Sequence, residues 1–260
     1  MQAAIAVVQL DVTTMRPDLN LERMESFIVK ATKLGAQLVV FPEDAVTGPL
    51  GGQTAFIEQA PGYLAHFQAL AVKYGVDLVP GTWTVREGEA LYNTAYYINR
   101  DGTVAGSYRK VNLWETEKLA LTPGPGVSVF PTAHGIVGLI VCWDIAFPAM
   151  FAEMNRQGVE MVISPTYWSF TPKAERIESV GDDEILLIDS LCTARAFEND
   201  IVLVYCNAAG ELEDGSAVLS GRSQVTHPAD KVLCKAEENE EEMLFVHVTH
   251  TRAQPAAGAV

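Results

Sequence analysis

The chain has 260 residues, of which 48% are hydrophobic, and this length and composition predict one domain with a substantial buried core. The 33 acidic and 18 basic residues give a formal net charge of −15, which argues against nucleic acid or an anionic membrane as a partner. The four cysteines form no close pair. We find neither a secretory leader nor an apolar run long enough to span a bilayer, so we expect a reduced, cytoplasmic protein.

The first half of the sequence alternates between strands and helices. An apolar strand is predicted first and is followed by a helix that Asn20 caps and Gly35 ends. Pro61 and Gly75 bound a second amphipathic helix. Asp101-Gly102 predicts a tight turn between two hairpin strands. The strands predicted in this half cover residues 3–10, 37–41, 77–83, 91–99 and 103–109.

The second half begins with an irregular loop over residues 111–126 and becomes rich in strands toward its end. Helices are predicted over residues 148–157 and from Asp182 or Asp183 to Phe197. The strands predicted here cover residues 137–142, 160–164, 201–206, 217–226, 230–234 and 243–249. Strands that alternate with helices and then form hairpins indicate an α/β sandwich of mixed sheets. We place this single domain at residues 1–252 and expect residues 253–260 to form a flexible tail.

Three reactive side chains lie at the ends of predicted elements. Cys142 ends one buried strand, Glu43 follows another, and Lys110 ends the hairpin. A cysteine attacks a carbonyl carbon as a thiolate, so it needs a base for its proton and a cation for the oxyanion. Glu43 and Lys110 could supply both, although a small buried hydrophobe and a capping or surface acid are the ordinary roles of cysteine and glutamate. His134 is the other candidate base, but its position at the far end of the Cys142 strand argues against it.

The remaining chemistry-bearing residues give weaker signals. Tyr167 and Trp168 follow the strand over residues 160–164, where they would either line a pocket or be singly exposed aromatics. The five histidines show no metal-ligand spacing, and His247 and His250 fit a strand segment better than a metal site. The sequence contains no Gly-x-Ser-x-Gly motif, phosphate loop or convincing dinucleotide fingerprint. We therefore predict neither a metal nor an organic cofactor.

Several short motifs occur in one order along residues 3–250. They are Phe41-Pro42-Glu43, Tyr108-Arg109-Lys110 with Pro123-Gly124 downstream, Cys142-Trp143-Asp144 with Phe147-Pro148, and softer matches at Arg195-Ala196-Phe197-Glu198-Asn199, Asn207 and Ser220-Gly221-Arg222-Ser223. With these motifs the chain resembles the carbon–nitrogen hydrolase, or nitrilase, superfamily, in its amidase-like branch. The resemblance implies an α-β-β-α sandwich of two mixed β-sheets flanked by helices.

The resemblance also implies roles for individual residues. Glu43 would be the general base, and Lys110 would stabilise the oxyanion. Cys142 would be the nucleophile, and the backbone N–H of Trp143 would complete the oxyanion hole. Family members place a second glutamate six residues before the Pro-Gly pair, which selects Glu117, with Glu115 as the competing residue. The chain departs from common family residues at Asn112 and Arg222, where histidine is frequent, and at Ala149, where glutamate is frequent. These departures leave the substrate and the packing of the loops open.

The implied reaction is hydrolysis of a small amide through a cysteine thioester, which releases an acid and ammonia or an amine without a cofactor. The same three residues serve N-carbamoyl amines and nitriles elsewhere in the superfamily. A thiol protease is less favoured because no histidine is well placed, and a non-catalytic binding protein on the same fold is the alternative from another class. Family nitrilases typically carry glutamate where Asp144 stands, which favours an amide over a nitrile.

Self-association is also predicted. The helices over residues 148–157 and 183–197 carry more apolar surface than a single buried stripe requires. The residues concerned are Met150, Phe151, Met154, Leu187, Leu191 and Phe197. Because family members pair through the equivalent helices, we expect a homodimer or a higher homo-oligomer.

Overall fold

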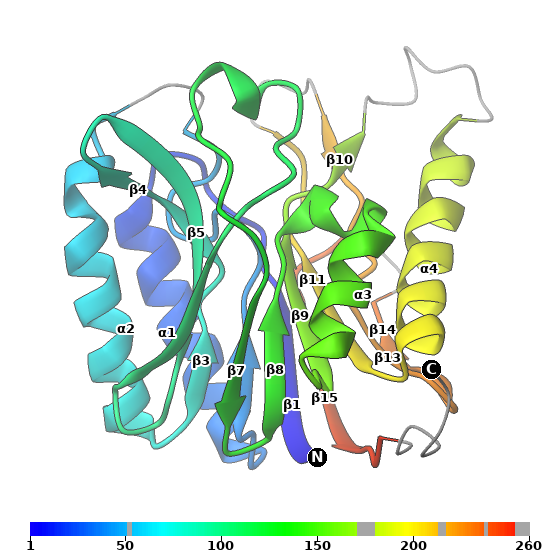
Figure 1. Ribbon diagram of the computed structural model, residues 1–260. Helices are drawn as coiled ribbons and strands as arrows, with labels where there is room; N and C mark the ends of the chain where they lie inside the picture. Colours follow the sequence, from blue (N-terminus) through cyan, green and yellow to red (C-terminus); the bar gives the residue numbers. More distant parts are fainter. Residues whose placement is uncertain (51–53, 171–179, 213–216, 237–238, 253–260) are drawn as a thin grey trace.

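The computed structural model describes residues 1–50, 54–170, 180–212, 217–236 and 239–252. The tail predicted over residues 253–260 lies outside these residues. Two mixed β-sheets pack face to face, and a pair of helices covers each outer face (Figure 1). The predicted α-β-β-α sandwich is therefore confirmed.

The first sheet has parallel strands at its centre and antiparallel strands at its edges. Its strands follow the order β15 (Glu242–Thr249), β1 (Gln2–Gln9), β2 (Leu38–Val40), β3 (Asp77–Val79), β5 (Ala90–Ile98) and β4 (Thr82–Glu87), and β6 (Val104–Arg109) also pairs with β5. β1, β2 and β3 are parallel to one another. Groups that follow parallel strands emerge at the same edge of the sheet.

The second sheet has the same mixed character. Its strands follow the order β14 (Lys231–Lys235), β13 (Gln224–His227), β11 (Val202–Asn207), β9 (Met161–Thr166), β8 (Gly135–Leu139) and β7 (Ser128–Thr132). β8, β9 and β11 are parallel. A small separate ladder joins β10 (Ser169–Phe170) to β12 (Val218–Leu219).

In the described part of the chain, four α-helices cover the sheets. α1 (Pro17–Lys33) and α2 (Ala60–Tyr74) lie against the first sheet, and α3 (Pro148–Arg156) and α4 (Val180–Asn199) lie against the second (Figure 1). The described residues also form the short 3-10 helices η1 (Ile57–Gln59), η2 (Glu117–Leu119) and η3 (Cys142–Ala146). Within the described part of the chain, none of the helices has the length and apolar character needed to cross a lipid bilayer.

Both faces of β1 are buried. Ile5 and Val7 belong to the core between the two sheets, whereas Ala6 and Val8 belong to the core that includes residues of α1 and α2. Successive side chains of a strand point to opposite faces, so a strand covered on both sides needs a continuous apolar sequence. The apolar run at residues 3–10 could be recognised for this reason.

The strand predicted over residues 77–83 is two strands, β3 and β4, separated by Pro80 and Gly81. Gly81 has a φ of 82°, and a Cβ atom there would lie 1.9 Å from the carbonyl oxygen of Pro42. Only glycine fits at this point. The close approach lets the chain turn beside the loop that carries Glu43.

Other boundaries also differ from the prediction. α1 begins at Pro17, and Asn20 is not its cap. Asn20 is buried inside the helix, and its amide donates to the carbonyl oxygens of Thr13 and Val46. The strand predicted over residues 217–226 is interrupted at Gly221 and Arg222, which both have positive φ. β7 has no counterpart in the prediction, because it contains Pro131 and proline argues against a strand. Proline is tolerated at the edges of sheets, and β7 lies at such an edge.

Candidate active site

Cys142 lies in a strained turn at the start of η3, which follows β8. β8 ends at Leu139 rather than at Cys142 as predicted, and Cys142 opens η3 with a φ of 50°. Positive φ is uncommon and costly for a residue other than glycine. The buried carboxylate of Asp144 supports this turn, because it accepts hydrogen bonds from the Val141 N–H at 3.0 Å and the Tyr108 hydroxyl at 2.7 Å.

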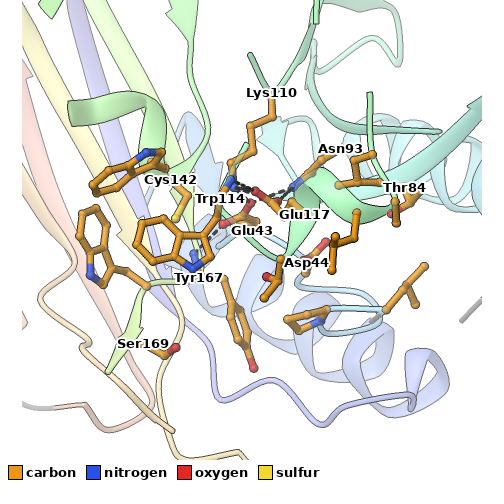
Figure 2. A pocket seen from close by; sticks show the side chains of 18 of the residues that line it. Glu43, Asp44, Thr84, Asn93, Lys110, Trp114, Glu117, Cys142, Tyr167 and Ser169 are labelled. Atoms are coloured by element: carbon orange, nitrogen blue, oxygen red, sulfur yellow. Dashed lines mark hydrogen bonds and ion pairs between the residues drawn. The ribbon is translucent and has the colours of Figure 1, made fainter. Parts of the chain in front are cut away.

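Glu43 and Lys110 form a buried ion pair close to this thiol (Figure 2). Lys110 Nζ lies 2.8 Å from Glu43 Oε1, and the two side chains are only 2% and 3% exposed. The Glu43 carboxylate also accepts hydrogen bonds from Asn93 Nδ2 at 2.8 Å and from the Tyr167 backbone N–H at 2.9 Å. The Cys142 thiol lies beside it at the same cavity (Figure 2). These contacts fix the carboxylate where it can receive the thiol proton.

Glu117 also contacts Lys110. The ammonium lies 2.9 Å from Oε1 and 2.8 Å from Oε2 of Glu117, and the Trp114 backbone N–H donates to Oε2 at 2.7 Å. Glu115, the competing residue, is exposed. The structure therefore brings Glu117 to the lysine, while the role of Glu117 in turnover stays a prediction.

The protonation states follow from burial and from these charges. Burial raises the pKa of the Cys142 thiol well above its usual value, and neighbouring Glu43 adds to the effect. Burial also raises the pKa of Glu43, against the lowering effect of Lys110. Burial alone would lower the pKa of Lys110, but Glu43, Cys142 and Glu117 hold it above its usual value. The resting thiol is thus protonated at neutral pH, and a thiolate forms as Glu43 takes the proton.

His134 lies away from this cluster. It occupies the turn between β7 and β8, at the far end of the strand that leads to Cys142, and its Nε2 lies 3.1 Å from Asp77 Oδ2. This position confirms the argument against His134 as the base. Among the residues that the structure describes, no group of three or more His, Cys, Asp and Glu side chains could hold a metal ion.

The reactive side chains open into a cavity of about 880 Å³. Tyr167 and Trp168 line it, as do Trp114 and Trp143. The ring of Trp143 packs against those of Trp114 and Trp168, with centroids 4.8 Å and 5.4 Å apart. A cavity of this size with an apolar wall and a few convergent polar groups suits a small-molecule ligand.

Some residues of the cavity were not predicted from the sequence. Asn93 is a buried polar residue of β5, and its amide bridges Glu43 and, at 3.3 Å, Glu117. An asparagine inside a buried strand was the available signal, because a buried amide needs partners. Asp44 and Trp114 lie in loops and also line the cavity, but loop residues show no periodic pattern from which burial could be inferred.

Two of the three departures from common family residues make contacts that support the surrounding structure. Asn112 donates through its backbone N–H and its Nδ2 to Asp144 Oδ1, at 2.8 Å and 2.9 Å. Arg222 pairs with Asp189 of α4, and Ala149 is exposed on α3. Asn112 therefore supports the turn at Cys142 through Asp144.

A thiol, a carboxylate and an ammonium group around one cavity are the groups that acyl transfer to cysteine requires. Residues 4–257 match the family described as carbon–nitrogen hydrolase. The chain is 30% identical to a probable nitrilase of Schizosaccharomyces pombe, with 98% of this chain and 92% of the relative covered. It is 29% identical to an omega-amidase of Danio rerio, with 94% and 87% covered.

Solved structures agree with this relationship. A mutant of the amidase from Nesterenkonia sp. AN1, in which acrylamide has added to the active site cysteine, has a TM-score of 0.85 and 29% identity, with 95% of this chain and 93% of that chain covered. The protein belongs to the carbon–nitrogen hydrolase family. The predictions of the family and of an amidase-type carbon–nitrogen hydrolase are thereby confirmed.

Proposed function

We propose that the protein hydrolyses a small linear amide through a thioester on Cys142. The observation that carries this proposal is the position of the Glu43 carboxylate, which binds the Lys110 ammonium at 2.8 Å and lines the same cavity as the Cys142 thiol. One group can then move the proton while its neighbour holds the oxyanion.

The reaction would proceed in two steps. Glu43 removes the thiol proton as the sulfur attacks the amide carbon, and the Lys110 ammonium and the Trp143 backbone N–H hold the resulting oxyanion. The tetrahedral intermediate collapses as protonated Glu43 gives its proton to the departing ammonia or amine, which leaves a thioester. Glu43 then deprotonates a water molecule that attacks the thioester. Collapse of the second intermediate releases the acid, and the thiolate takes back the proton from Glu43.

An amide fits these donors better than a nitrile does. Attack on an amide places negative charge on an oxygen, toward which Lys110 can direct its ammonium, whereas attack on a nitrile places the charge on nitrogen. Two of the similar proteins support an amide, namely the omega-amidase and the amidase that carries acrylamide on its cysteine. The probable nitrilase makes the nitrile the alternative to be tested.

A screen of ammonia release tests the proposal. Purified protein would be offered short aliphatic amides, ω-amides of dicarboxylic acids, carbamoyl amines and the matching nitriles, with Cys142→Ala as the control. We expect ammonia from an amide, little from the nitrile of the same chain, and an acyl adduct on Cys142 in intact-mass spectra after brief exposure. Faster hydrolysis of the nitrile or of a carbamoyl amine would contradict the amide assignment. If no compound gave either turnover or an adduct, a non-catalytic binding protein would be favoured.

A further inference from the structure

Asp44 is a second carboxyl group that directly follows Glu43 and lines the same cavity. Its φ of 52° is in the left-handed region, which aspartate and asparagine enter more readily than most residues. Neighbouring side chains of an extended strand point to opposite sides. The left-handed turn instead brings two consecutive carboxyl groups to one cavity (Figure 2).

The protein provides Asp44 with one neutral partner. The Thr82 hydroxyl donates to Oδ1 at 3.4 Å, and its oxygen accepts from the Asp44 N–H at 3.0 Å. Lys110 forms its ion pairs with Glu43 and Glu117. Among the described side chains, no lysine, arginine or histidine is paired with the Asp44 carboxyl.

The cavity carries more acidic than basic groups. Of the described residues that line it, Lys110 is the basic one, and the acidic ones are Glu43, Asp44, Glu117 and Glu184. Burial, together with the charges of Glu43 and Glu117, raises the pKa of Asp44 well above its usual value. A cation brought by a ligand would relieve this repulsion, and a further carboxylate would increase it.

Tyr167 adds an aromatic surface beside Asp44. Tyr167 and Asp44 line the same cavity (Figure 2), and burial together with the charge of Asp44 raises the pKa of the Tyr167 hydroxyl. An aromatic ring next to a carboxylate favours an alkylammonium group, since the ring face attracts cations and the carboxylate accepts their hydrogen bonds.

We propose that Asp44 determines specificity by binding an ammonium group of the substrate, so that the enzyme prefers amino amides to neutral amides and to ω-amides of dicarboxylic acids. The inference rests on the proposed amide hydrolysis and orders its candidate substrates. Figure 2 shows Asp44 and Cys142 on either side of Glu43. This arrangement suits a substrate whose amide lies at the thiol while its distant end reaches Asp44.

Matched substrates test the inference. One set is 4-aminobutanamide, pentanamide and glutaramate, and a longer set is 5-aminopentanamide, hexanamide and adipamate, in which only the terminal group changes from ammonium to methyl to carboxylate. We expect kcat/KM in the better set to be about tenfold or more higher for the amino amide than for the ω-carboxylate amide, with the neutral amide between them. The ratio within one enzyme preparation cancels any general loss of activity.

Asp44→Asn is the informative variant, because asparagine also tolerates positive φ and keeps the size of the side chain. We expect it to reduce the preference for the amino amide over the ω-carboxylate amide to about threefold or less. Glu184→Gln removes another acid of the cavity, contributed by α4, and should keep most of this preference. A wild-type preference for the carboxylate, an unchanged ratio in Asp44→Asn, or an equal effect of Glu184→Gln would overturn the assignment.

Binding to Cys142→Ala, measured by calorimetry, separates this inference from the proposed reaction. Tighter binding of the amino amide, lost when Asp44→Asn is added, would support the role of Asp44 even if no compound were hydrolysed. Turnover of the neutral amide without any charge preference in turnover or binding would support the reaction and reject the role of Asp44.

Discussion

The Lys110 ammonium contacts both carboxylate oxygens of Glu117, at 2.9 Å and 2.8 Å. A lysine held in this way cannot swing away from the oxyanion that it would stabilise. We therefore predict that Glu117→Gln lowers kcat by about 10- to 100-fold, because supporting groups around a catalytic cation have effects of this size. The unfolding midpoint should change much less than the rate.

Glu115→Gln is the matched control for that experiment, since Glu115 is exposed and lies two residues away. Steady-state kinetics of both variants with the best amide would decide between them. Damage by Glu115→Gln together with normal activity of Glu117→Gln would contradict the assignment.

Cys142→Ala should abolish turnover and leave the fold intact. Replacing a thiol by a hydrogen removes little buried volume but removes the nucleophile. Ammonia release and thermal unfolding would be measured for this variant and for Cys234→Ala, which changes a half-buried free thiol in β14. We expect the control to keep its activity. Normal turnover by folded Cys142→Ala protein would exclude the thioester mechanism.

The sequence was informative about Cys142 where the chemistry is local. The apolar run before it predicted the strand, and the flanking motifs identified the family. Its positive φ could not be predicted, because the turn depends on Asp144, which is held by Tyr108 and Asn112 from a distant part of the chain. Such contacts form only when the two sheets pack together.

The place of a site residue in its strand decides whether it could be predicted. Glu43 and Lys110 follow recognisable strands, so their positions at the sheet edges could be inferred. Asn93 lies within β5, opposite Thr84 of β4, and the assembly of this sheet brings its amide to Glu43. A single sequence does not show which polar strand residue will be buried beside a charge.

Asn93→Asp should shift the pH dependence of kcat/KM. Glu43 must be ionised to accept the thiol proton, so activity falls as the pH drops below its pKa, which burial already raises. A carboxylate in place of the Asn93 amide, 2.8 Å from Glu43 Oε1, would raise that pKa further. We therefore expect the acidic limb of the profile to move to higher pH and the maximal rate to fall.

Asn93→Ala provides the comparison, since it removes the amide without adding charge. It should lower the rate with a smaller shift of the acidic limb. An acidic limb that stays in place in Asn93→Asp would show that Glu43 does not control the proton transfer.

The surface that we propose for a homodimer lies on α4 and does not include the α3 residues expected from the sequence. Met150, Phe151 and Met154 are buried in the core, with exposures of 9%, 0% and 0%, because α3 packs onto the second sheet and α4. That part of the prediction is wrong. Among the described side chains of α4, the large apolar ones that remain exposed are Leu186, Leu187 and Phe197, at 65%, 44% and 74%.

Phe197→Glu should weaken a dimer formed through this face, because a buried carboxylate at an interface lacks a partner. Light scattering at micromolar concentration would compare it with wild type and with Leu34→Glu, which changes an exposed leucine at the end of α1, on the opposite outer face. We expect a 28.2 kDa species to accumulate only in Phe197→Glu. If light scattering gave this mass for the wild-type protein as well, the proposed dimer would be rejected.

Asp144→Glu tests whether this position selects amides over nitriles by direct contact. Asp144 is fully buried and is not among the described residues that line the cavity, so its carboxylate acts through the turn at Cys142. An added methylene in this closed site should displace the hydrogen bonds to Val141 and Tyr108, at a cost of about 1–3 kcal/mol in the free energy of unfolding. We expect lower amide turnover and no gain with the matching nitrile, measured by chemical denaturation and ammonia release. A stable variant that hydrolyses the nitrile faster than the amide would show that this side chain sets the substrate directly.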